Sequence, residues 1–485
     1  MIVGATWMIA ARLAERLLGL CSTVILARLL APSDFGLVAM AMVFVSAADL
    51  LGAFGLDWAL IRQPDLQRRH LDTAWTIRVI LGLASFGALA LIALPAADFY
   101  AEPKIAPMVL VLGLSLLVAA FENPGVVMFR REMNFRKEFQ LRTAAKVFGA
   151  VVAVGVAVAF RSYWALLLGT LGGRLISTLM SYAVHPHRPM PSLAARKELM
   201  SFSIWLWISN VLTFLRTRIV EMLLGRMAGA RGLGLFTVAS ELAQLASSEL
   251  AAPIHRVLYS AYAANGSQPA AVGSAYLTAA SAILTITLPV IAITYLAAPH
   301  IILLMLGPQW SDAVPLLQRL AIAGALGIFS VGTVHVFWAI NKARLETIVE
   351  VCWVSCLITA VVILTPSRGV IGAADAVLIS STAILPLNLI LLRRYAGVSL
   401  LAMLDRSWRT VSACLVMTGV VNGFIAVDPA SSSAEAVWRL VTIALVGGAV
   451  YVATLLGLWG LMGKPDGPER DILSLVRTRL GGSPL

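Results

Sequence analysis

Charged side chains interrupt apolar segments at several places in this chain of 485 residues. In the first segment, Arg12, Glu15 and Arg16 stand in a run that is otherwise almost entirely hydrophobic. Their spacings, continued by Gly19 and Thr23, place these residues on one face of a helix. Ionisable groups in such surroundings are costly and usually face a cavity or a partner. Because arginine presents a fork of donors that matches phosphate, the stripe predicts a site for an anion such as a pyrophosphate.

A second polar stripe lies between residues 201 and 224 and corresponds to the first in position. A shift of 198 positions brings Arg12, Glu15, Gly19 and Thr23 onto Asn210, Thr213, Thr217 and Glu221. Arg216 and Arg218 flank this second stripe on either side. Matching stripes in two halves of a chain are what a shared central cavity would need, with one wall from each half.

These positions define two sets of candidate residues. The predicted substrate-binding residues are Arg12, Arg16, Arg78, Asn210, Arg216, Arg218 and Arg256. The candidates for binding a coupling ion are Asp49, Glu221, Glu241 and Glu249. Two other interpretations stay open. Arg12, Glu15 and Arg16 could neutralise one another or extend to the membrane surface, and Glu241 and Glu249 could simply pair with arginine.

The elements that must position these residues are long apolar helices. The chain is 59% hydrophobic and 13% charged, with a mean hydropathy of +0.88, which excludes an ordinary soluble domain. An apolar helix of about 20 residues spans a bilayer. The sequence predicts fourteen such spans, near residues 4–30, 35–61, 73–97, 105–129, 140–160, 163–185, 201–224, 232–261, 272–298, 313–340, 345–366, 369–392, 408–427 and 436–462.

The basic residues predict the orientation of these spans. With a cytoplasmic N-terminus, the inner loops and tail hold 21 Lys and Arg residues and the outer loops hold 6. This is a clear positive-inside bias. An even number of spans places both termini in the cytoplasm, and we expect a multi-pass membrane protein. The formal charge of +12 therefore reflects topology and does not indicate nucleic-acid binding.

The sequence also predicts an internal repeat. The shift of 198 places Arg28 on Arg226 and Gly36 on Gly234. We expect an all-α polytopic membrane protein with two six-helix lobes and two additional helices. The predicted parts are an N-lobe at 1–190, a C-lobe at 195–395, the additional helices at 408–462 and a basic cytoplasmic tail at 463–485. Six helices per lobe give both lobes one orientation, a design found in transporters.

No pattern of residues in the sequence indicates catalysis. The chain lacks the phosphate-binding GxxxxGK[ST] loop, the HExxH zinc motif and the GxSxG nucleophile motif. The four cysteines all fall within apolar spans, and their spacing suggests neither a disulfide framework nor a metal site. We therefore expect a protein that is not an enzyme and that uses no cofactor or metal.

Three segments resemble the Wzx-type polysaccharide flippases of the multidrug/oligosaccharidyl-lipid/polysaccharide exporter superfamily. They are ARLLAPSDFGLVAMAMVF at 27–44, GLDWALIRQ at 55–63 and FRREMNFRKEF at 129–139. The resemblance implies two six-helix lobes around a cationic cavity, and alternating access of that cavity to the two sides. It also implies the substrate, an oligosaccharide on undecaprenyl pyrophosphate, and the location, the bacterial inner membrane. There the substrate is moved from the inner to the outer leaflet for exopolysaccharide or lipopolysaccharide synthesis. Polysaccharide polymerase and export proteins are the partners it suggests.

Three rival functions remain. An ion-coupled multidrug antiporter of the same superfamily should favour acidic residues for cationic drugs, whereas these stripes lean basic. A membrane-bound O-antigen polymerase or ligase typically carries a large periplasmic loop, and the polar breaks of this chain are short. A flippase for peptidoglycan precursors would be essential for growth.

Overall fold

The computed structural model describes most of the chain as helix. It covers residues 2–52, 56–63, 65–200, 203–264, 268–424, 432–463 and 467–470. Within these ranges, side chains are described except at residues 2–15, 51, 52, 58, 62, 135, 200, 203–213, 216, 248–261, 263, 264, 329–331 and 343. Every regular element in the described ranges is a helix, so the predicted all-α class is confirmed.

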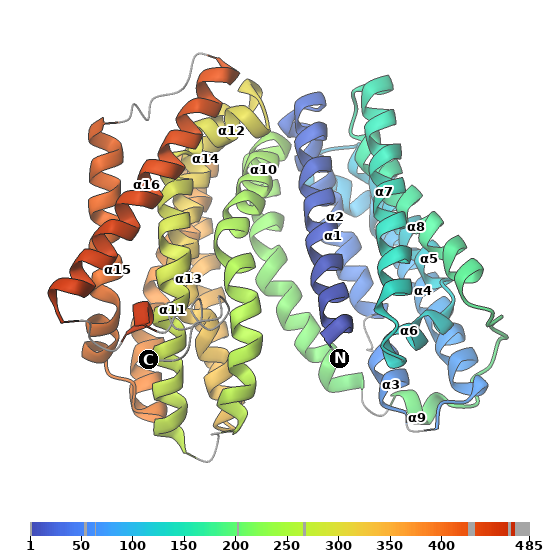
Figure 1. Cartoon of the computed structure of the whole chain (residues 1–485). Helices are drawn as coiled ribbons and strands as arrows, with labels where there is room; N and C mark the ends of the chain where they lie inside the picture. Colours follow the sequence, from blue (N-terminus) through green and yellow to red (C-terminus); the bar gives the residue numbers. More distant parts are fainter. Residues whose placement is uncertain are drawn as a thin grey trace. The chain divides into compact units, whose positions relative to one another are not determined.

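The chain forms two compact units, residues 1–234 and 235–485. The predicted lobe boundaries at 190 and 195 stay a prediction. The helices of unit 1 are α1 (Ile2–Leu29), α2 (Pro32–Gly52), α3 (Leu56–Arg62), α4 (Arg68–Tyr100), α5 (Ile105–Ala120), η1 (Pro124–Val126), α6 (Val127–Arg131), α7 (Phe135–Phe160), α8 (Trp164–Val184), α9 (Arg196–Met200) and the first part of α10 (Ser203–Ala264) (Figure 1).

The second unit contains the rest of α10 and six more α-helices. These are α11 (Pro269–Leu296), α12 (Ala298–Met305), α13 (Val314–Ala339), α14 (Ala343–Ala396), α15 (Leu400–Phe424) and α16 (Ser433–Leu461), with a 3-10 turn η2 (Pro308–Ala313). Both α10 and α14 contain a break at a glycine with positive φ, at Gly229 (φ 69°) and Gly369 (φ 60°). Glycine reaches this conformation without the penalty that a Cβ brings.

Fourteen long helices result in the described part of the chain when α10 and α14 are each divided at their glycine, in agreement with the predicted number. By length and composition alone, seven described helices could cross a membrane, or eight if one bent pair counts as a single span. That pair is Ile105–Ala120 and Pro124–Arg131, which meet at 67°.

Two predicted spans are shorter in the structure. The span expected at 35–61 ends as α2 at Gly52, and a separate short helix α3 follows. The span expected at 105–129 ends at Ala120 because Asn123 precedes a proline, which disfavours a helical backbone. Instead, the Asn123 Oδ1 atom accepts a hydrogen bond from the Gly125 amide at 2.9 Å and begins the 3-10 turn.

Small residues bring the helices α7 and α8 of unit 1 together. A Cβ placed on Gly169 of α8 would lie 2.5 Å from the Ala153 Cβ and 2.9 Å from the Gly149 oxygen, both on α7. The Gly169/Gly173 pair therefore serves close helix packing, as GxxxG pairs do in membranes.

A reciprocal contact joins the first turn of α2 to the part of α10 that follows its break. A Cβ on Gly36 would overlap the carbonyl oxygen of Ala230, and a Cβ on Gly234 would overlap the carbonyl oxygen of Pro32. The same shift of 198 that relates Gly36 to Gly234 relates Pro32 to Ala230. Positions that the sequence predicts to be equivalent therefore contact each other backbone to backbone.

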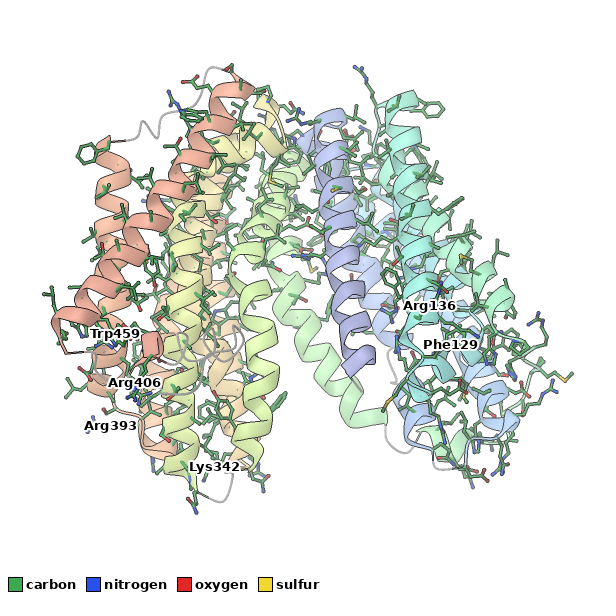
Figure 2. All side chains as sticks on the ribbon, in the orientation of Figure 1. Phe129, Arg136, Lys342, Arg393, Arg406 and Trp459 are labelled. Carbon is green, nitrogen blue, oxygen red and sulfur yellow. The ribbon has the colours of Figure 1, made fainter. Side chains whose placement is uncertain are left out.

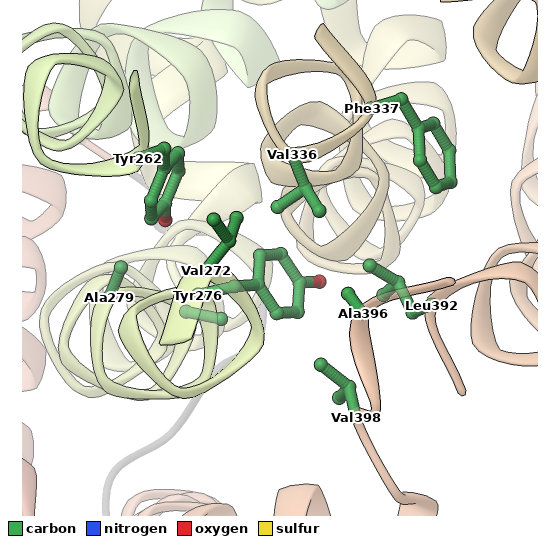
Figure 3. Packing of buried hydrophobic residues seen from close by; sticks show 10 residues of the cluster. Tyr262, Val272, Tyr276, Ala279, Val336, Phe337, Leu392, Ala396 and Val398 are labelled. Atoms are coloured by element: carbon green, nitrogen blue, oxygen red, sulfur yellow. The ribbon is translucent and has the colours of Figure 1, made fainter. Parts of the chain in front are cut away.

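One buried cluster of unit 2 is built from α10, α11, α13 and α14. Tyr262, Val272 and Tyr276 meet Phe337 and Leu392 in one buried cluster (Figure 3). Several cations that the topology prediction assigned to inner loops gather at one end of this unit: Lys342, Arg393 and Arg406 (Figure 2).

Candidate substrate-binding site

A chain of ion pairs joins α3, α4, α6 and α7 in unit 1. Arg130 Nη1 lies 3.8 Å from Asp57 Oδ2, and Arg130 Nε donates to Glu138 Oε1 at 2.7 Å. Arg142 Nη2 lies 3.0 Å from the same Glu138 oxygen, and Arg78 pairs with Asp57 Oδ1. Three guanidinium groups and two carboxylates leave this cluster, the unit 1 ion-pair cluster, with a net charge of +1.

Arg78 is the member of this cluster that the sequence predicted. It stands ten residues into α4, or about 15 Å along the helix axis. Its side chain is 21% exposed, so the guanidinium pairs with Asp57 and is still partly accessible. The Arg78 guanidinium can therefore both pair with Asp57 of α3 and bind an anion.

Lys146 on α7 is a cation that the prediction missed. A Cβ placed on Gly19 of α1 would lie 3.2 Å from the Lys146 Nζ, so the ammonium group reaches the predicted polar face of α1. One turn earlier on each helix stand Arg16, which is half-buried, and Arg142. A single lysine inside the predicted span at 140–160 was the signal that could have found it.

A second predicted cation lies on α10. Arg218 Nη1 donates to Glu221 Oε2 at 2.6 Å, one turn along the same helix. The structure therefore brings together a predicted substrate-binding residue and a predicted coupling-ion residue.

The other predicted residues are placed less fully. The side chains of Arg12, Asn210, Arg216, Glu249 and Arg256 lie outside the described residues. Besides Glu221, two acidic candidates have described side chains, Asp49 in unit 1 and Glu241 in unit 2.

Asp49 on α2 is exposed and within electrostatic reach of Arg174 on α8. Glu241 on α10 in unit 2 is half-buried. Their assignment as coupling-ion residues stays a prediction.

Unit 2 has charged pairs that fix its own helices. Arg319 Nε donates to Asp375 Oδ1 at 2.7 Å, and Arg368 Nη1 donates to Asp375 Oδ2 at 2.9 Å. Arg409 on α15 forms a bidentate ion pair with Glu469: Nε donates to Oε1 at 2.7 Å and Nη2 donates to Oε2 at 3.1 Å. Both side chains of this last pair are almost fully buried, at 5% and 1% exposure.

The connector at residues 185–200 folds back onto unit 1. The side chains of α4 accept hydrogen bonds from its backbone amides: Met190 N to Asp72 Oδ1 at 3.0 Å, Ser192 N to Thr76 Oγ1 at 2.8 Å and Ala195 N to Thr73 Oγ1 at 3.2 Å. Asn123 Nδ2 donates to the carbonyl oxygens of His185 and His187 at 3.3 and 2.8 Å. The connector is therefore fixed along its length.

Two histidine–carboxylate contacts complete this attachment. His187 Nε2 lies 3.2 Å from Asp72 Oδ1. His70 Nδ1 accepts from the Gln67 amide at 2.9 Å, which places the proton of the neutral ring on Nε2. That nitrogen donates to Glu198 Oε2 at 2.8 Å.

We expect the connector to loosen as the pH falls. Burial lowers the pKa of His187 below its ordinary 6.5, against the opposing effect of Asp72. The hydrogen bond from His70 lowers the pKa of Glu198 below its ordinary 4.5. A lowered pKa means that the released state takes up protons first, so attachment is complete above pH 6.5, weakens below it, and loses the Glu198 contribution below 4.5.

The measurement for this prediction is hydrogen exchange of the Met190, Ser192 and Ala195 amides at pH 7.5 and 5.5, corrected for intrinsic rates. Protection should fall at pH 5.5, while amides in the middle of α7 keep theirs. Equal protection of the connector at both values would contradict it.

The described side chains can bind an anion inside an apolar helical protein. They include guanidinium and ammonium groups whose positive charge is only partly balanced by neighbouring carboxylates. No group of three or more His, Cys, Asp or Glu residues in the described part of the chain could hold a metal ion.

Comparison with known proteins shows which family the sequence matches. Residues 25–315 match the profile of a family described as "Polysaccharide biosynthesis protein". The lipopolysaccharide biosynthesis protein WzxC of Escherichia coli (strain K12) is 26% identical over 349 residues, covering 71% of this chain and 70% of that protein. The succinoglycan biosynthesis transport protein ExoT of Rhizobium meliloti (strain 1021) is 24% identical over 301 residues, covering 62% and 61%.

A solved structure has the same fold. The lipid II flippase MurJ, in an inward closed conformation, superposes with a TM-score of 0.74 at 14% sequence identity. The superposition covers 95% of this chain and 100% of that one.

Proposed function

Because the chain belongs to the polysaccharide biosynthesis protein family, we propose that it is a flippase for lipid-linked oligosaccharides. Its substrate is an oligosaccharide repeat unit on undecaprenyl pyrophosphate, moved across the bacterial inner membrane by alternating access. The product serves exopolysaccharide or lipopolysaccharide synthesis. The names of the relatives, a lipopolysaccharide biosynthesis protein and a succinoglycan transport protein, support this assignment.

The observation that carries the proposal is the set of cations on apolar helices of unit 1. Arg78, Arg142 and Lys146 stand where a charge is costly unless it has a use. The guanidinium fork binds the oxygens of a pyrophosphate with parallel hydrogen bonds. Binding and release of such a group change no covalent bond, so the proposed activity is transport and not catalysis.

The cellular setting is part of the proposal. Both termini lie in the cytoplasm, as the distribution of Lys and Arg predicts, and polysaccharide polymerase and export proteins act on the product. A multidrug antiporter is the second candidate, and drug resistance on overexpression would favour it. A polymerase or ligase would instead join lipid-linked units in vitro.

A deletion strain tests the function. Surface polysaccharide should be lost, and lipid-linked oligosaccharide should accumulate on the cytoplasmic side of the inner membrane. Accumulation of single repeat units on the periplasmic side would mean that polymerisation or ligation is the missing step, and the proposal would fail.

When Arg78→Ala is expressed in the deletion strain, surface polysaccharide should be at least about tenfold lower than with the wild type. A tenfold effect corresponds to the loss of about one charged hydrogen bond to the substrate. Arg78→Lys should keep part of the export, because it keeps the charge but not the fork. Arg439→Ala is the matched control, since Arg439 pairs with Glu435 on α16 and lies outside the predicted site. Equal export by Arg78→Ala and wild type, at equal protein levels in the membrane, would remove Arg78 from the site.

A further inference from the structure

In the ion pair between Arg218 and Glu221, the carboxylate balances the positive charge of a predicted anion-binding residue. The two atoms are 2.6 Å apart, and the side chains are 31% and 17% exposed. Arg218 is therefore the more accessible partner. A phosphate that takes the Nη1 hydrogen now donated to Glu221 must displace the carboxylate from it.

The surroundings of Glu221 offer a place for the displaced carboxylate. Tyr100, the last residue of α4, is 6% exposed, and its buried hydroxyl has no hydrogen-bond partner among the described residues. Its ring lies on Gly225, one turn beyond Glu221, where a Cβ would be 2.8 Å from the Cε1 atom. The negative charge of Glu221 acts on this tyrosine. A buried hydroxyl without a partner is costly, so it is ready to donate to a carboxylate that moves away from Arg218.

The described residues that α2 places beside Tyr100 and Gly225 are apolar. From α2, Met40 faces Gly225 and Phe44 meets the Tyr100 ring edge to face at 5.8 Å. The described charged group that interacts with Glu221 is Arg218. The Glu221 carboxylate is bound to the guanidinium of Arg218, and the phenol of Tyr100 lies within its electrostatic reach.

We propose that Glu221 is an internal substitute for the anionic substrate: it occupies Arg218 in the empty carrier, and the substrate's diphosphate displaces it toward Tyr100. This inference rests on the proposed function. It explains why an acid stands beside a substrate-binding arginine. The pair of Arg218 and Glu221 carries no net charge, and such a pair costs less to carry through an apolar environment than a single charge.

The proposal predicts opposite effects on binding and on export. Glu221→Gln removes the competing carboxylate, so inorganic pyrophosphate should bind the purified full-length protein about tenfold more tightly. The same variant should export less polysaccharide, because the empty carrier then returns with an unpaired arginine. Tyr100→Phe should weaken pyrophosphate binding several-fold, since the displaced carboxylate loses its donor.

Titration calorimetry of the wild type, Glu221→Gln, Tyr100→Phe and Arg218→Ala in detergent measures the binding. Glu435→Gln is the matched control, because it removes the acid of another pair within a single helix and should leave affinity unchanged. Unchanged or weaker binding by Glu221→Gln, with normal binding by the wild type, overturns the inference and leaves the flippase function standing. A wild type with no affinity for pyrophosphate, together with unaltered polysaccharide in the deletion strain, would instead refute the function.

Discussion

Replacing Gly36 or Gly234 with valine should abolish polysaccharide export and strongly reduce the amount of protein in the membrane. A Cβ at either position meets the carbonyl oxygen of the facing segment, at Ala230 or Pro32. A backbone atom cannot turn aside as a flexible side chain can, so α2 and α10 must separate. Overpacking of this kind typically costs about 1–3 kcal/mol or more.

The test is thermal unfolding of the purified variants together with export in the deletion strain. Gly87→Val is the control, because a Cβ at Gly87 has no atom within 4 Å and brings the same change of residue type on a helix of unit 1. The prediction fails if the Gly36→Val and Gly87→Val proteins unfold at the same temperature.

Glu469→Ala should destabilise unit 2 by about 3–5 kcal/mol, because it leaves the Arg409 guanidinium buried without its counter-charge. Both side chains are almost fully buried, so water cannot replace the lost partner. The double variant Arg409→Met/Glu469→Leu should recover most of the loss, since an apolar pair needs no counter-charge.

Denaturation of the purified variants measures this loss. Glu435→Ala breaks a pair whose side chains are 21% and 32% exposed, and it should cost less than about 1 kcal/mol. A Glu469→Ala protein as stable as Glu435→Ala would show that the buried pair is not needed for the stability of unit 2.

The helices could be predicted from the sequence, but the bends within them could only partly be predicted. Runs of apolar residues separated by polar breaks are a strong signal, and the fourteen long helices follow from it. The end of α2 was missed because apolar residues continue past Gly52. The end of α5 was missed because the apolar run resumes at Val126, soon after Glu122 and Asn123, so average hydropathy does not mark the break. The signals there were glycine at 52 and proline at 124.

The sequence predicted which types of residue form the candidate site, but it did not predict which residues pair with each other across helices. Helical spacing placed Arg218 on the flank of the polar stripe that contains Glu221, and the structure pairs these two residues. The partner of Arg78 is 21 residues away on another helix, at Asp57, and periodicity says nothing about contacts between helices. Lys146 was missed because it falls outside both polar stripes, and only the packing of α7 on α1 places it beside Gly19.

The attachment of the connector has a consequence for how its sequence can vary between relatives. Its amides at Met190, Ser192 and Ala195 donate the bonds, and any residue except proline supplies an amide. The acceptors are side chains of α4, at positions 72, 73 and 76. Positions 190, 192 and 195 of the connector can therefore take any residue except proline, whereas positions 72, 73 and 76 need a side chain that accepts a hydrogen bond. The connector can vary in sequence at these three positions and still keep its place on α4.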